Sequence, residues 1–160
     1  MATIEDNEEF KIPAMIEPDL LQLIPKTEYI PKKRAEFPLI VWELPFKVES
    51  ESNLNENMHV KRKRKNIQYK YIWAAFVNET AISKNKTILP YPCTVKLIRM
   101  GKRNLDDDNL ISGFKYIRDE VASLIKPGLA RGRADDDPKI RWEYDQVKSK
   151  MNACRIEFYL

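Results

Sequence analysis

The chain has 160 residues and 43% hydrophobic side chains, which is enough for one folded domain and an extension. It contains no stretch near the roughly 20 apolar residues that a membrane-spanning helix needs. One histidine and two cysteines argue against a histidine-based zinc centre, a Ser-His-Asp triad and a disulfide framework. Any chemistry must therefore depend on carboxylates, lysines or hydroxyl groups, and we expect a cytoplasmic protein with reduced cysteines and no membrane partner.

The charge of the chain is unevenly distributed. Residues 1–38 carry 5 basic and 8 acidic side chains, whereas residues 39–160 carry 23 basic and 16 acidic ones. Much of the positive charge lies in one uninterrupted run, Lys61-Arg62-Lys63-Arg64-Lys65. Such a run is typical either of a solvated surface or of a surface that binds a polyanion such as nucleic acid.

Residues 1–38 are predicted to form an acidic extension without a long helix, because five prolines interrupt them. Within this extension, residues 18–24 begin with a proline and continue with apolar residues, which predicts one short helix. The folded domain is expected to span residues 39–160.

The first half of the domain predicts one strand and one helix. Leu39–Leu44 is an apolar run between two prolines, as is typical of a strand. The basic run begins a helix that reaches at least Asn78, because apolar residues recur there at helical spacing. Three tryptophans lie in apolar patterns and are expected in the core: Trp42, Trp73 and Trp142.

The second half predicts a strand, a helix and two closing strands. Thr94–Met100 has the pattern of a strand, and Asp108–Ile125 has apolar residues at three- and four-residue steps before a Pro-Gly pair ends the helix. Ile140–Gln146 and Ala153–Tyr159 predict the last two strands. We therefore expect an α+β fold: a mixed β-sheet of about four strands with two main helices, in the order β-α-β-α-β-β.

Two acidic clusters, Asp106-Asp107-Asp108 and Asp135-Asp136-Asp137, are the most unusual feature of the sequence. Adjacent carboxylates repel one another unless a cation neutralises them. Mg²⁺ can do so through one or two carboxylates, water molecules and the phosphate oxygens of a substrate. Each cluster alone also has a simpler interpretation, since the first could cap the following helix and the second could be a solvated loop.

Together with their flanking residues, the clusters resemble the RusA family of Holliday-junction resolvases. That family carries an Asp-x-Asp-Asn-Leu motif at the start of a helix and, after the helix, an Asp-Asp-x-x-Val/Ile motif at the start of a strand. The matching residues are Asp106, Asp108, Asn109 and Leu110, then Asp136, Asp137 and Ile140. Two further segments are similar to phage-type members: Arg118-Asp119 and the run from Asp137 to Trp142. The resemblance covers about residues 39–160 and has no counterpart for the extension.

The resemblance implies a dimeric crossover junction endodeoxyribonuclease that depends on Mg²⁺, with Mn²⁺ as a possible substitute. Such an enzyme cuts four-way DNA junctions by metal-assisted hydrolysis of a phosphodiester. The resemblance further implies that Asp106, Asp108 and Asp137 are the catalytic metal ligands and that Asp136 supports them.

One position departs from the family pattern. The family often places a catalytic lysine one helical turn after the second aspartate of the first motif, where this chain has Ser112. Lys115 projects from the same helix face one turn further along. We expect Lys115 either to take over the catalytic role or to be a solvated surface lysine.

Basic residues are expected to offset the repulsion between the carboxylates and DNA. The run from Lys61 to Lys65 would contact phosphates and produce a salt-dependent affinity. Arg131 and Arg133 precede the second acidic cluster, where they could contact a phosphate close to the metal. For both groups the alternative is an ordinary solvated surface.

Two main functions follow from the sequence. The first is a Mg²⁺-dependent endonuclease, from a phage or another mobile element, that resolves Holliday junctions in recombination, repair or phage DNA processing. A homodimer is expected for this function, because two symmetric cuts need two active sites. The second is a catalytically silent protein of the same fold that binds branched DNA. A third role, in which the acidic extension makes regulatory contacts, is motivated only by the charge contrast.

Overall fold

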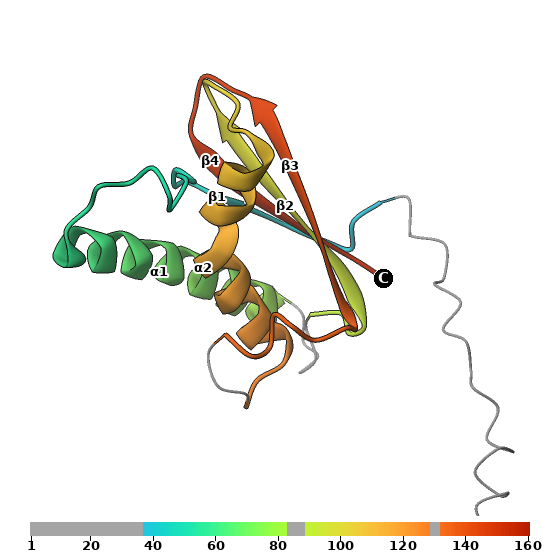
Figure 1. Ribbon diagram of the computed structural model, residues 1–160. Helices are drawn as coiled ribbons and strands as arrows, with labels where there is room; N and C mark the ends of the chain where they lie inside the picture. Colours follow the sequence, from blue (N-terminus) through green and yellow to red (C-terminus); the bar gives the residue numbers. More distant parts are fainter. Residues whose placement is uncertain (1–36, 83–88, 129–131) are drawn as a thin grey trace, which may run out of the picture. The chain divides into compact units, whose positions relative to one another are not determined.

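The computed structural model describes residues 37–82, 89–128 and 132–160. Nearly all of the acidic extension, including the predicted helix at residues 18–24, and Arg131 lie outside the described residues. The described elements follow the predicted order (Figure 1). They are β1 (Ile40–Leu44), α1 (Met58–Ile82), β2 (Cys93–Gly101), α2 (Asp107–Ile125), β3 (Ile140–Lys148) and β4 (Ala153–Tyr159). The expected α+β class with two helices and four strands is confirmed.

The four strands form one mixed sheet in the order β1-β4-β2-β3. β4 pairs antiparallel with both β1 and β2, whereas β2 and β3 are parallel. Parallel neighbours need a connection that returns along the length of the sheet. α2 makes this return, so it begins beyond the last residue of β2 and ends near the first residues of β2 and β3 (Figure 1).

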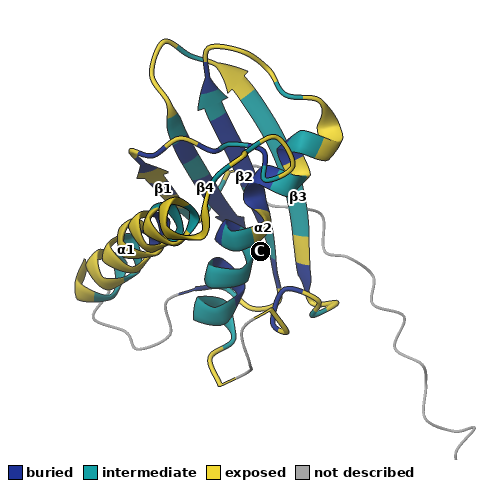
Figure 2. Cartoon of the chain, turned by 60° about the vertical axis from the view of Figure 1, so that its left-hand side comes forward, coloured by how far each residue is buried: buried dark blue, intermediate teal, exposed yellow. Residues whose placement is uncertain are grey.

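Both helices pack on one face of the sheet (Figure 2). The core between the layers contains side chains with no exposed surface from β2, β4 and α2: Val95, Leu97, Ile156, Phe158, Phe114, Ile117 and Val121. The alternation along the strands and the three- and four-residue steps along α2 place these residues on facing surfaces. Neither described helix is long and apolar enough to cross a membrane.

α1 contributes less to the core than its sequence predicts. It has 25 residues, yet only Gln68 and Ile72 are buried. Trp73, expected in the core, is 45% exposed and stacks on Tyr69, with ring centroids 6.5 Å apart. The prediction was wrong because α1 carries its own apolar residues on several faces, so their periodicity does not identify the one face that is buried. Trp42 is buried as expected.

Candidate metal and nucleic-acid site

The first acidic cluster lies at the start of α2. Asp106 is the N-cap residue, and its carboxylate accepts a hydrogen bond from the backbone N–H of Asn109 at 3.3 Å. Asp107 and Asp108 occupy the first turn and are exposed. Their negative charges are favourable at the positive end of the helix dipole. The capping interpretation is therefore confirmed for Asp106, while the side chain of Asp108 makes no hydrogen bond or ion pair with any described residue.

The loop after β1 lies against the beginning of α2. Ser50 donates a hydrogen bond to the Asn109 side chain, and the hydroxyls of Ser52 and Ser112 are 3.2 Å apart. Gly113 permits this close approach, because a Cβ at that position would be only 3.0 Å from the backbone oxygen of Glu49. Ser112 thus contacts the loop after β1. It occupies the position at which the resembled family often has a lysine, so no charged side chain stands there.

The second acidic cluster contains a carboxylate that is fully engaged in structural contacts. One oxygen of Asp137 forms an ion pair with Lys126 and accepts a hydrogen bond from Tyr91 Oη at 3.1 Å. The other accepts the backbone N–H of Lys139 at 2.9 Å. The hydrogen bond from Lys126, followed by that from the Lys139 backbone, lowers the pKa of Asp137 to about 2. Asp137 therefore joins the end of α2 to the beginnings of β2 and β3.

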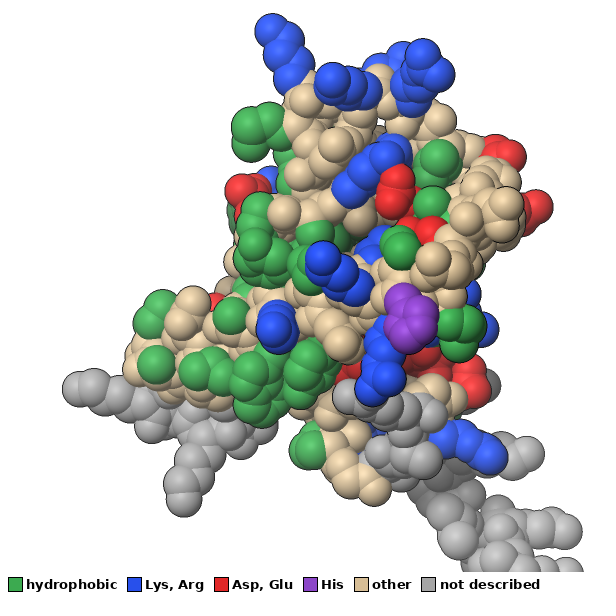
Figure 3. Space-filling view, turned by 90° about the vertical axis from the view of Figure 1, so that its left-hand side faces the viewer, with side chains coloured by type: hydrophobic (Ala, Val, Ile, Leu, Met, Phe, Trp, Pro, Cys, Tyr) green, Lys and Arg blue, Asp and Glu red, His purple; other side chains and the backbone are tan. Residues whose placement is uncertain are grey.

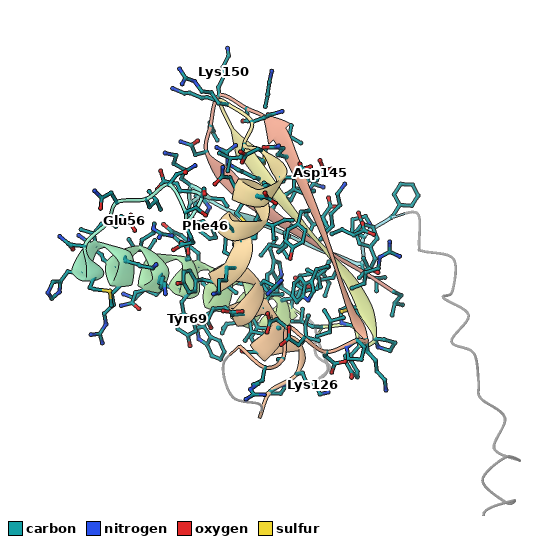
Figure 4. All side chains as sticks on the ribbon, in the orientation of Figure 1. Phe46, Glu56, Tyr69, Lys126, Asp145 and Lys150 are labelled. Atoms are coloured by element: carbon teal, nitrogen blue, oxygen red, sulfur yellow. The ribbon has the colours of Figure 1, made fainter. Side chains whose placement is uncertain are left out.

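The two acidic clusters lie at opposite ends of α2. The helix has 19 residues, which corresponds to about 28 Å at 1.5 Å per residue. Lys126, which contacts Asp137, marks the end of α2 far from Asp106 and Asp108 (Figure 4). The expected site with Asp106, Asp108 and Asp137 around one metal is thus not assembled within the described chain. The exposed Asp136 also lies at the far end. Residues 37–82, 89–128 and 132–160 contain no group of three His, Cys, Asp or Glu side chains that could hold a metal ion.

The engaged state of Asp137 predicts a pH-dependent loss of stability in Asp137→Asn. A carboxylate with a lowered pKa stabilises the folded state above its ordinary value of 3.8, and this stabilisation is lost as the pH falls towards about 2. Asp137→Asn should therefore lower the urea midpoint at pH 7, and the difference from wild type should shrink below about pH 4. Asp136→Asn is the matched control and should leave the midpoint unchanged. Equal losses in both variants would contradict the assignment.

Two residues of the basic run form ion pairs with other residues of the protein. Arg64 pairs with Glu51 at 2.7 Å and with Glu56 at 3.0 Å, and its side chain is only 13% exposed. Lys61 also pairs with Glu51, at 3.2 Å. These two residues hold the loop before α1 and are poorly placed for the phosphate contacts that were expected of the whole run. Sequence reasoning could not separate them from their neighbours, because the partners lie in a loop without a regular pattern.

The remaining basic residues of the run differ in exposure. Arg62 and Lys63 are exposed, whereas Lys65 is half-buried, with its Nζ 3.1 Å from the ring centroid of Tyr116 on α2. Figure 3 shows Lys and Arg side chains beside apolar side chains on the side of the molecule where α1 begins. Arg62 and Lys63 are therefore accessible to phosphate groups, which is the condition for electrostatic binding of nucleic acid.

A groove separates α1 from α2, and we call it the α1–α2 groove. It encloses about 460 Å³ and has basic, aromatic and acidic walls: Arg62, Lys65, Tyr69, Tyr116, Asp119 and Glu120. Tyr69 projects from α1 towards this region in Figure 4. Cations and aromatic rings together suit a phosphate backbone and its sugars or bases.

A pair of carboxylates beside the groove was missed by the sequence reasoning. Asp135 is only 8% exposed, and its Oδ2 receives a 2.6 Å hydrogen bond from Arg118. Burial, followed by the negative charge of Asp135, raises the pKa of Asp119. The exposed Lys115, one turn before Asp119, contributes a smaller opposing effect. The sequence signals were Asp135 as a member of the second acidic cluster and the Arg118-Asp119 pair within the resemblance, and neither carried a functional assignment.

Arg133 and Asp136 are exposed in the loop before β3, and Arg133 remains a candidate phosphate contact.

Comparisons with protein-family models, with curated proteins and with solved structures find no match to this chain. The function is therefore inferred from the residues of this chain and from their positions in the structure.

Proposed function

We propose that this protein is a Mg²⁺-dependent endonuclease that cuts branched DNA, above all four-way junctions, in the cytoplasm. One observation carries the proposal: exposed carboxylates at the start of α2 and cations of α1, the exposed Arg62 and Lys63 and the half-buried Lys65, lie on two helices that pack together. Lys65 reaches Tyr116, which is eight residues, or about 12 Å, along α2 from Asp108. A DNA strand held by the cations could thus extend to the carboxylates.

The carboxylates at the start of α2 fit the requirements of Mg²⁺ better than Asp137 does. Asp108 is exposed and has no cationic partner among the described residues, and Asp106 lies two positions before it. Mg²⁺ commonly binds one or two carboxylates and completes its shell with water and phosphate oxygens. We therefore assign the metal to Asp106 and Asp108. When bound, the ion supplies charge stabilisation and a more acidic water for hydrolysis.

The other residues of the site bind and orient the substrate. Arg62 and Lys65 hold phosphates at the α1–α2 groove, and Lys63 extends this basic surface. Lys115 is exposed on the same face of α2 as Asp108. In this proposal it contacts a phosphate oxygen near the scissile bond and partly replaces the lysine that Ser112 displaces.

A homodimer is part of the proposal, because a junction is resolved by two symmetric cuts. α1 exposes a row of large apolar side chains that lie four residues apart: Tyr69, Trp73 and Val77. A second copy that covers this row would bury the apolar surface and place two nuclease sites in one particle. Sedimentation equilibrium that reports only monomers at assay concentrations would remove this part of the proposal.

A second function is favoured by one observation. Asp137 is separated from Asp106 and Asp108 by the length of α2. The three carboxylates that the resemblance implies as metal ligands therefore do not meet at one site. A protein with this fold and the same basic surface could bind branched DNA without cutting it.

A cleavage assay distinguishes the two functions. The full chain is incubated with a labelled four-way junction or with a linear duplex of the same sequence, each in Mg²⁺ or in chelator. We expect paired nicks in the junction only with Mg²⁺, and little cleavage of the duplex. Junction binding without nicks in Mg²⁺ would support the binding protein, and equal cleavage of both DNAs would remove the specificity for branches.

A further inference from the structure

We propose that a pocket between α1 and the loop after β1 holds one unpaired base of bound DNA. The inference rests on the DNA binding of the proposed function, but it does not depend on cleavage. The pocket encloses about 290 Å³, and we call it the β1–α1 pocket. This volume is close to the lower end of the range for small-ligand sites, which suits one planar base and not a base pair.

The walls of the β1–α1 pocket are largely apolar. Phe46 supplies an aromatic wall and contacts Tyr71 of α1, with ring centroids 6.2 Å apart (Figure 4). Val60 and Ile67 of α1 also line the pocket, although they are 49% and 42% exposed. Contacts to phosphates do not explain two exposed apolar side chains in and beside a strongly basic run. These side chains suit the face of a base, which packs against apolar and aromatic groups.

Gln68 gives the pocket one polar group that lacks a partner. It is 4% exposed, and its Nε2 has no hydrogen-bond partner among the described residues. Leaving a buried donor unpaired is costly. A half-turn of the terminal amide exchanges its nitrogen and oxygen, so Gln68 can present a donor or an acceptor to a ligand in the pocket that it lines. The edge of a base that has left the duplex carries groups of both kinds.

The cations of the β1–α1 pocket favour a base that is still joined to its phosphates. Lys63 lines the pocket, is exposed, and makes no ion pair with any described residue. Lys47 is a second cation of the lining and pairs with Glu49. A free base or an uncharged apolar ligand would leave Lys63 without a partner, whereas the phosphates of a DNA strand would pair with it.

The loop that forms one wall of the pocket also touches α2 near its start. Glu49 lines the pocket, and its backbone oxygen would be 3.0 Å from a Cβ at Gly113 of α2. Gly113 lies five residues, or about 7.5 Å, along α2 from Asp108. A base in the pocket would therefore lie close to the proposed metal ligands. Extrusion costs least for a base that is already unpaired, so the pocket would favour the branch point of a junction over a duplex.

The fluorescent base 2-aminopurine reports whether a base leaves the stack, because neighbouring bases then no longer quench it. It is placed at successive positions around the branch point of a four-way junction, and the full chain is added in chelator. We expect a rise in fluorescence at one position beside the branch point and none within an arm. Ile67→Trp fills the pocket from a partly exposed position and should bind without this rise. Met58→Trp, at an 80% exposed position of α1 outside the pocket, should retain it.

An abasic junction separates base binding from a general effect of the new side chain. Ile67→Trp should bind the intact junction about tenfold more weakly than the wild type does. Both proteins should bind equally to a junction that lacks the responsive base. Equal losses on the two junctions, or no selective rise of fluorescence with the wild type, would overturn the inference. Cleavage is measured separately, so nicking without the rise removes only the pocket, and the rise without nicking removes only the nuclease.

Discussion

Replacing Arg118 with methionine is expected to lower the free energy of unfolding by about 3–5 kcal/mol, measured by urea denaturation in chelator. Arg118 is the residue that neutralises Asp135, whose side chain is 5% exposed. Without the guanidinium, a carboxylate remains buried with an uncompensated charge, and Tyr144 Oη also loses a donor. The loss is large because the removed partner leaves a charge behind in a region of low dielectric, which surface ion pairs do not do.

Two further variants separate this explanation from a simple loss of packing. Arg118→Met combined with Asp135→Asn should recover much of the stability, because no buried charge remains. Arg141→Met is the matched control: Arg141 is 3.6 Å from Glu143, and its side chain is 75% exposed. It should change the stability by less than about 0.5 kcal/mol. A double variant as unstable as the sum of its single changes would contradict the buried-charge explanation.

Removing both Arg62 and Lys65 is expected to weaken junction binding and to flatten its salt dependence. Each phosphate contact contributes about 0.9 to the slope of log affinity against log salt. The double alanine variant should therefore have a slope shallower by about 2, measured by fluorescence anisotropy in chelator so that cleavage does not interfere. The affinity should fall for every DNA sequence, since phosphate contacts carry no base information.

A second double variant controls for the loss of net charge alone. Lys148 and Lys150 are exposed near the connection between β3 and β4, and Lys150 lies far from the α1–α2 groove in Figure 4. Lys148→Ala with Lys150→Ala removes the same charge and should leave the slope nearly unchanged. Equal effects of the two double variants would mean that DNA responds to the overall charge and not to the groove.

The fold could be predicted because each element has a clear pattern of its own. In α2, apolar residues from Leu110 to Val121 recur along one face, and the same residues are buried in the structure. α1 lacks such a single face, so its existence was predictable but its orientation was not. Contacts with the sheet select Gln68 and Ile72 for burial and leave Trp73 exposed.

The candidate site was predicted less completely. The spacing of two motifs in the sequence does not tell whether the helix between them brings them together or holds them apart. The parallel pairing of β2 and β3 forces α2 to run the length of the sheet. This geometry places Asp106 and Asp137 at opposite ends, although each motif begins the element that was expected. The partners of Arg64 and Asp135 come from loops and from another element, and no periodic pattern announces such contacts.

The most direct measurement of the central claim compares two neighbouring aspartates in single-turnover cleavage of a four-way junction. Asp107 and Asp108 are both exposed in the first turn of α2, but only Asp107 lines the pocket that also contains Lys96 and Asp145. We expect Asp108→Asn to bind the junction as the wild type does and to lose Mg²⁺-dependent nicking, whereas Asp107→Asn retains it. Wild-type nicking by Asp108→Asn would contradict a metal-dependent nuclease site at the start of α2.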